Sequence, residues 1–154
     1  MTTPGGVSVG EEDHVRAAVE ALGRLHFWRL AIKPGRPLLF GARGDGYAFG
    51  LPGNPVSTFV LFEVAVRPFL HRLTGHRYRP VEVRVRLAEG VERSRAERLD
   101  HIPVALDADG GARPVEYHGS AHIHAYCAAD GILRIPPAVR GIAAGETVSV
   151  IVVR

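Results

Sequence analysis

The second half of the chain has the clearest alternation of apolar and polar residues. Residues 81–87 read Val-Glu-Val-Arg-Val-Arg-Leu, the period of two that is typical of a strand with one buried face. Shorter apolar runs predict further strands at 101–106, 113–117, 132–135 and 147–153, with a turn over 107–111. A short helix is expected over 121–129. This half of the chain is therefore predicted to form a small all-β, barrel-like domain.

The first half mixes helical and extended patterns. The spacing of Val15, Val19 and Leu22 predicts a helix that ends at Gly23, and a second, mostly buried helix is expected over 56–73. One strand is predicted at 26–32 and a hairpin from 37–41 and 47–51, whereas residues 1–4 are not expected to form a strand. The pattern changes near residue 78. We therefore predict an α/β domain over 1–78 and the barrel-like domain over 79–154.

Composition narrows the class of protein. With 154 residues, 46% of them hydrophobic and 23% charged, the chain is expected to fold rather than to be disordered. The longest strongly apolar stretch, 56–66, is too short to span a membrane and contains Glu63. The N-terminus has neither a basic region nor an apolar run, so we expect a cytoplasmic protein. Cys127 is the only cysteine, which excludes an internal disulfide, and it is expected to be a small buried residue.

The charges do not indicate a nucleic-acid partner. The net charge is +3, but acidic and basic residues alternate along the chain and no run of five like charges occurs. Of the 19 basic residues, only Lys33 is a lysine. A lone lysine among arginines indicates a site that needs a compact ammonium rather than a planar guanidinium.

A glycine-rich segment at the start of the chain could bind an anion. Gly5 and Gly6 allow backbone N–H groups to approach an oxyanion, Ser8 adds a hydroxyl, and the predicted helix follows. The alternative is an entry loop with an ordinary helix cap. Asp13 is expected in the first helical turn with two neighbouring glutamates, either to complement the helix dipole or to bind a metal or lie at an oxyanion site.

Two further loops carry polar groups on a fixed backbone. Lys33 and Arg36 lie on a loop that two prolines stiffen and Gly35 releases, which suits a phosphate or another tetrahedral oxyanion. The alternative is a turn with solvated charges. In the loop over 51–57, Asn54 is a candidate helix cap and Ser57 a first-turn hydroxyl.

Two other kinds of site are not supported. His118, His122 and His124 lack the spacing and acidic neighbours of a zinc site, so we expect ordinary surface or packing histidines. Ser8 lies in a Gly-x-Ser-x-Gly sequence by coincidence, because a nucleophile elbow requires a strand before the serine.

The three loops resemble, in the same order, those of the MoeA family, the molybdopterin molybdenumtransferases related to the gephyrin E-domain. The matching segments read Gly-Gly-Val-Ser-Val-Gly-Glu from residue 5, Lys-Pro-Gly-Arg-Pro from residue 33 and Gly-Leu-Pro-Gly-Asn-Pro-Val-Ser from residue 50. Residues 119–120 and 129–136 resemble the C-terminal barrel of the family. The resemblance implies an α/β fold, part of a three-layer molybdopterin-binding domain, followed by a small β-barrel-like domain.

The resemblance also implies a reaction. Members of the family insert molybdate into adenylylated molybdopterin and release AMP, with a divalent cation such as Mg²⁺. It assigns catalytic roles to Lys33 and Arg36 and both a catalytic and a metal-binding role to Asp13. The residues that it assigns to cofactor binding are Gly5, Gly6, Ser8, Pro37, Gly53, Asn54, Ser57 and Ser120.

Departures from the family leave a second interpretation open. Arg36 stands where the family usually has a second lysine, His124 and Ala125 stand where serines are common, and an arginine usual near Pro103 is missing. The chain also begins almost directly at the Gly5 loop, so the first half of the pterin-binding domain is expected to be absent. The alternative is a non-catalytic module that binds pterin or a partner. A homodimer is expected, both from the resemblance and because a sheet that starts near Gly5 has an open edge.

Overall fold

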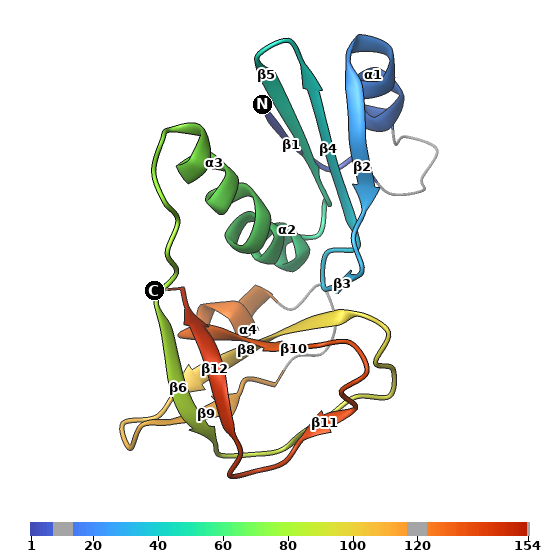
Figure 1. Ribbon diagram of the computed structural model, residues 1–154. Helices are drawn as coiled ribbons and strands as arrows, with labels where there is room; N and C mark the ends of the chain where they lie inside the picture. Colours follow the sequence, from blue (N-terminus) through green and yellow to red (C-terminus); the bar gives the residue numbers. More distant parts are fainter. Residues whose placement is uncertain (8–13, 117–122, 154) are drawn as a thin grey trace. The chain divides into compact units, whose positions relative to one another are not determined.

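The chain folds as two units, each with its own sheet (Figure 1). The computed structural model describes residues 1–7, 14–116 and 123–153, of which residues 123 and 124 are described by their backbone alone. The first unit comprises Met1–Leu30 and Pro34–His76, and the second comprises Ala31–Lys33 and Arg77–Arg154. Each unit is described by itself below.

The first unit is built on a four-stranded sheet with the order β1-β5-β4-β2. Its strands are β1 (Thr2–Pro4), β2 (Arg24–Arg29), β4 (Pro37–Arg43) and β5 (Gly46–Leu51). Strands β4 and β5 form the predicted hairpin. Helix α1 (Val15–Leu22) contacts β2, β4 and β5. Gly41 permits this packing, because a Cβ there would lie 2.4 Å from Cγ1 of Val19.

Strand β1 contradicts the expectation that residues 1–4 form no strand. Thr2 to Pro4 pair in parallel with Phe49 to Leu51. The backbone N–H of Phe49 also donates to the carbonyl of Met1 at 2.9 Å. Three residues that include a proline show no hydrophobic period, so the strand is specified by its partner β5 and not by its own sequence.

One long helical segment follows β5, as predicted, but its middle is wider than an α-helix. It consists of α2 (Pro55–Leu61), the π-helix η1 (Phe62–Val66) and α3 (Arg67–Leu73), and the chain turns at Thr74 and Gly75. Pro68 has no N–H to donate to the preceding turn, and a π segment just before it absorbs that interruption.

The second unit contains a five-stranded β-barrel, as predicted. Its strands are β6 (Glu82–Leu87), β8 (Leu99–Leu106), β9 (Gly111–Pro114), β10 (Gly131–Ile135) and β12 (Thr147–Val152). The order β10-β12-β6-β9-β8 is closed by antiparallel pairing of β8 with β10. A two-stranded ribbon joins β7 (Val91–Glu92) to β11 (Gly141–Ile142). The barrel encloses a core of Leu87, Val104, Ala112, Leu133, Ile135, Val148 and Val150.

Strand β3 (Ile32–Lys33) joins this sheet from a distant part of the sequence. It pairs in parallel with β8, with Ile32 opposite Leu99 and Lys33 opposite Asp100. The strand predicted over 26–32 is therefore split. Residues 24–29 belong to the first sheet, whereas Ile32 belongs to the second.

Three further expectations are corrected or limited by the structure. Cys127, at the end of α4 (Ile123–Cys127), is exposed rather than buried. Helix α1 begins at Val15, and the first turn that the structure describes contains no acidic residue. Asp13 itself, like Ser8, His118, Ser120 and His122, lies outside the described residues. Within the described ranges, no helix is long and apolar enough to cross a membrane.

Candidate functional site

The glycine turn after β1 has a backbone conformation that favours glycine. Gly5 and Gly6 have φ values of 86° and 71°, in the left-handed region that favours glycine. The N–H of Gly5 donates to the carbonyl of Leu51 at 2.8 Å, and the carbonyl of Gly6 accepts from the N–H of Val15 at 3.3 Å. The turn is thus fixed to β5 on one side and to the start of α1 on the other.

Trp28 supports the same turn from β2. Its indole Nε1 donates to the carbonyl of Val7 at 2.9 Å. The guanidinium carbons of Arg16 and Arg29 lie 4.2 Å and 3.9 Å from the centroid of its ring. Two cations are therefore held close to the glycine turn by cation–π contacts. The sequence analysis missed them, because no local pattern connects Trp28 with Val7 or Arg16.

The loop between β5 and α2 lies directly beside the glycine turn. A Cβ added to Gly53 would lie 3.7 Å from the Cα of Gly5, which is ordinary contact distance. Oδ1 of Asn54 accepts a hydrogen bond from the N–H of Ser57 at 3.0 Å, and Pro55 follows at the first helical position. Asn54 is thus the predicted helix cap. Ser57 lies in the first turn but is only 6% exposed.

The loop over 33–37 is fixed by packing as well as by proline. Gly35 has a φ of 105°, and a Cβ there would lie 2.8 Å from Cγ of Leu61. Gly35 therefore cannot be replaced without strain. The N–H of Leu30 donates to the carbonyl of Arg36 at 2.9 Å, which joins the two sides of the loop. Pro37 begins β4, and the side chain of Arg36 is exposed.

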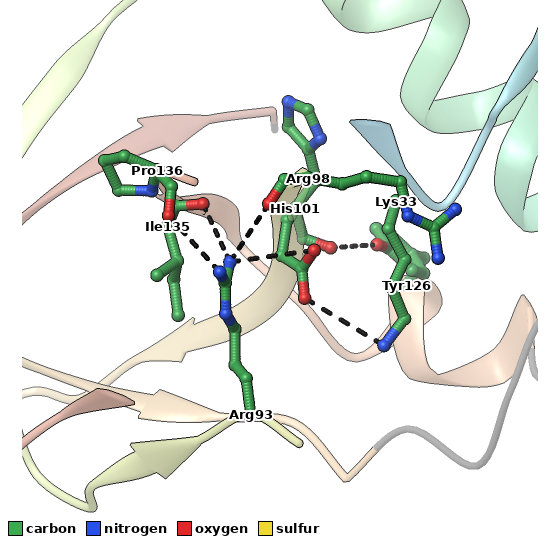
Figure 2. A network of polar contacts seen from close by, with 8 residues as sticks. Lys33, Arg93, Arg98, His101, Tyr126, Ile135 and Pro136 are labelled. Carbon is green, nitrogen blue, oxygen red and sulfur yellow. Dashed lines mark hydrogen bonds and ion pairs between the residues drawn. The ribbon is translucent and has the colours of Figure 1, made fainter. Parts of the chain in front are cut away.

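Lys33 lies at the edge of a buried charged cluster in the second unit (Figure 2). Its Nζ is 3.9 Å from Oδ2 of Asp100, and the other oxygen of Asp100 is 3.7 Å from Nη1 of Arg93. The side chains of Asp100 and Arg93 are 8% and 4% exposed, whereas that of Lys33 is 58% exposed. The ammonium of Lys33 is therefore accessible to solvent, whereas the two charged side chains behind it are buried.

Two neighbouring residues complete the surroundings of Lys33. Burial is the main reason why the pKa of His101 is lowered from 6.5 to about 4, against an opposing hydrogen bond with the backbone of Lys33. His101 is therefore neutral near pH 7. The hydroxyl of Tyr126 donates to the carbonyl of His101 at 3.1 Å and ties α4 to β8.

The structure brings some of the predicted site residues together and leaves others apart. Gly5, Gly6, Gly53 and Asn54 lie on two adjacent loops of the first unit. Arg36, Pro37 and Ser57 belong to the same unit, whereas Lys33 belongs to the second. Asp13, Ser8 and Ser120 are outside the described residues, and the parts of the chain that are described hold no group of three His, Cys, Asp or Glu suited to a metal ion.

Comparison of the sequence and the structure with known proteins identifies the family of this chain. Residues 2–72 match the family described as a probable molybdopterin binding domain, and residues 84–153 match the MoeA C-terminal region, domain IV. The crystal structure of the molybdopterin biosynthesis MoeA protein of Pyrococcus horikoshii superposes with a TM-score of 0.82 at 30% sequence identity, over 99% of this chain. The chain belongs to the MoeA family.

The names of individual relatives agree with this family. A molybdopterin biosynthesis protein of Methanocaldococcus jannaschii is 32% identical over 149 residues, which are 95% of this MoeA chain and 34% of that protein. The molybdopterin molybdenumtransferase of Haemophilus influenzae is 47% identical over 77 residues, 50% of this chain and 19% of that enzyme. This chain covers 37% of the Pyrococcus structure. It therefore spans about a third of the length of the relatives that it matches from end to end, and what it corresponds to is the C-terminal portion of the family.

Proposed function

We propose that this MoeA chain takes part in molybdenum cofactor biosynthesis, in the insertion of molybdate into adenylylated molybdopterin with release of AMP. The carrying observation is the pair of adjacent loops, in which the left-handed turn at Gly5 and Gly6 lies against Gly53. The N–H of Gly5 is taken by the carbonyl of Leu51, so the N–H groups that this turn would offer to an anion begin at Gly6. A pterin phosphate is an anion of the size and charge that such groups bind.

The side chains of the two loops and of Lys33 have different proposed roles. Asn54 and Pro55 fix the start of α2 next to the glycine turn and so hold the second loop in place. Lys33 offers an exposed ammonium to an oxyanion such as molybdate or a phosphoryl group. Arg36, Pro37, Ser57 and the undescribed Ser8 and Ser120 are proposed to bind the same substrates. Fixed donors that face developing negative charge stabilise the transition state of such a transfer.

Asp13 is the one residue that we propose as a ligand of Mg²⁺. Magnesium commonly takes one or two carboxylates and completes its shell with water and substrate phosphates, so a single protein carboxylate suits it. When bound, Mg²⁺ would neutralise phosphate charge. Among the described residues, no group of three His, Cys, Asp or Glu is arranged to hold a metal ion, and Asp13 stays a prediction.

The proposal is tested by AMP release. The purified chain is incubated with adenylylated molybdopterin, molybdate and Mg²⁺, and the Lys33→Gln variant is compared with Arg84→Gln, a matched control that removes an exposed cation from β6. We expect Lys33→Gln to lower AMP release by about 100-fold, the size typical of a lost charge-stabilising donor, and the control to leave it unchanged. Equal release by both variants would contradict the role of Lys33.

A binding module is the second outcome of this experiment. If the chain binds pterin, seen as quenching of Trp28 fluorescence, but releases no AMP even with the upstream portion of a relative added, the catalytic proposal fails. The departures at Arg36 and Pro103 would then account for the lost activity.

The assembly and the compartment are proposed on less direct grounds. Among the described strands, β1 pairs only with β5, so its other edge is open to a partner strand. We propose a homodimer in the cytoplasm. Sedimentation at micromolar concentration should give twice the chain mass, and a stable monomer would contradict the dimer.

A further inference from the structure

The carboxylate of Asp100 lies between two cations of the second unit. One oxygen is 3.9 Å from Nζ of Lys33, and the other is 3.7 Å from Nη1 of Arg93. The register explains the placement, because β3 pairs with β8 so that Lys33 lies opposite Asp100. A carboxylate that is 8% exposed needs a compensating positive charge to stay ionised.

The two cations differ in how firmly they are held. Nη1 of Arg93 donates to the carbonyl of Ile135 at 3.0 Å and to that of Arg98 at 3.3 Å, and Nη2 donates to the carbonyl of Pro136 at 3.3 Å (Figure 2). Arg93, which follows β7, is therefore fixed by carbonyls at the end of β10 and just before β8, and its charge is paired with the buried Asp100. The side chain of Lys33 is 58% exposed and its ammonium has donors to spare.

The charges of the cluster leave one positive charge at its exposed end. Arg93 and Asp100 form a buried pair of zero net charge, and the neutral ring of His101 adds none near pH 7. Without Arg93, Asp100 would have Lys33 as its nearest counter-charge. The pair of Lys33 and Asp100 would then be neutral and would attract an oxyanion less strongly.

We infer that Arg93 is a positioning residue for Lys33, because it neutralises Asp100 and so leaves the ammonium of Lys33 to bind an oxyanion. The inference rests on the proposed oxyanion-binding role of Lys33. It assigns a function to a buried arginine side chain, just after β7, that no motif marks.

The single lysine of the chain makes this testable on the intact protein. Reductive methylation with ¹³C-formaldehyde labels Lys33 as the only lysine side chain, besides the N-terminal amine, and keeps its positive charge. Its methyl signal in a ¹H–¹³C spectrum is followed during titration with molybdate. The variants are Arg93→Gln, Asp100→Asn and their combination, with Glu89→Gln as a matched control that removes the carboxylate of an exposed ion pair in the same unit.

The variants are expected to differ in sign. With one charge of the cluster removed, Arg93→Gln should weaken molybdate binding about fivefold, and Asp100→Asn should strengthen it by a similar factor. The double variant should return to within about twofold of the wild type, and Glu89→Gln should not differ from the wild type. A merely structural role of Arg93 would not give opposite signs or a rescue by the double variant.

The outcomes separate this inference from the proposed function. Unchanged affinity in folded Arg93→Gln, or weaker binding in Asp100→Asn, overturns the inference. If Arg93→Gln does not fold by circular dichroism, Asp100→Asn and the charge-retaining Arg93→Lys decide, with tighter and unchanged binding expected. A wild-type signal that does not respond to molybdate contradicts the role of Lys33 itself. The inference about Arg93 is then tested by the methyl chemical shift of Lys33 without anion. Arg93→Gln must change this chemical shift, and the double variant must restore the wild-type value.

Discussion

The two units of this chain place their candidate binding groups by different means. In the first unit the backbone does so, through left-handed glycines at 5, 6 and 35 and a capped helix start at Asn54. In the second unit, Lys33 is placed by an ion pair with the buried Asp100, which is itself paired with the buried Arg93. A backbone site depends on torsion angles and close approach, whereas a side-chain site depends on charge and burial. The two should respond to different perturbations.

The largest expected effect is a pH dependence of the second unit. The folded-state pKa of His101 is about 4, below the ordinary value of 6.5 that applies in the unfolded chain. Between these values the unfolded chain binds a proton that the folded chain does not, so stability falls as the pH falls from 6.5 to about 4. The loss is about 3 kcal/mol when the whole window is crossed.

Urea unfolding between pH 4 and pH 7 measures this effect. The His101→Gln variant should show a smaller loss on acidification than the wild type, because the titrating ring is gone. The exposed His26→Gln variant serves as the control and should retain the wild-type dependence. Identical pH profiles for wild type and His101→Gln would show that burial of this ring does not govern the acid stability of the barrel.

The next effect belongs to the first unit and is independent of charge. Gly35→Ala forces a side chain into a backbone with φ of 105° and brings its Cβ within 2.8 Å of Leu61. We expect a loss of about 2 kcal/mol from strain and overpacking together. Gly75→Ala has a φ of 78° with open space around the Cβ, so it measures a torsional cost without overpacking, about 1 kcal/mol. Equal losses in the two variants, measured by thermal unfolding, would exclude a steric contribution at residue 35.

The smallest effect concerns the helix cap. Asn54→Ala removes the side-chain acceptor of the Ser57 N–H and should cost about 1 kcal/mol. Asn54→Asp keeps an acceptor at that position and should unfold within a few tenths of a kcal/mol of the wild type. The urea midpoints of the two variants provide the measurement, and a loss in Asn54→Asp as large as in Asn54→Ala would mean that the cap bond is not the source.

Local patterns predicted the elements that carry their own signal. The alternation at 81–87 gave β6, the helical spacing at 15–22 gave α1, and the Asn-Pro pair at 54–55 gave the start of α2. The family relationship followed from three short loops in the correct order. In each case a few adjacent residues are enough for the prediction, because hydrophobic periodicity, helix capping and turn formation depend on residues that are close in sequence.

Elements that depend on distant partners were missed. Strands β1 and β3 are three and two residues long, and each exists because a neighbouring strand supplies its hydrogen bonds. The exposure of Cys127 likewise depends on which face of α4 the barrel covers. No window of the sequence contains these partners.

The family, the two kinds of fold and the loops that carry glycine, lysine and asparagine can be predicted from the sequence, because they follow from residue identity and local spacing. That Lys33 pairs with β8 of the second unit, with Asp100 beside it and Arg93 beside Asp100, follows from the tertiary structure alone. The reason is physical. The charge that Lys33 presents to a ligand depends on burial and on ionic partners more than fifty residues away, and electrostatic energy depends on distance in space, not along the chain.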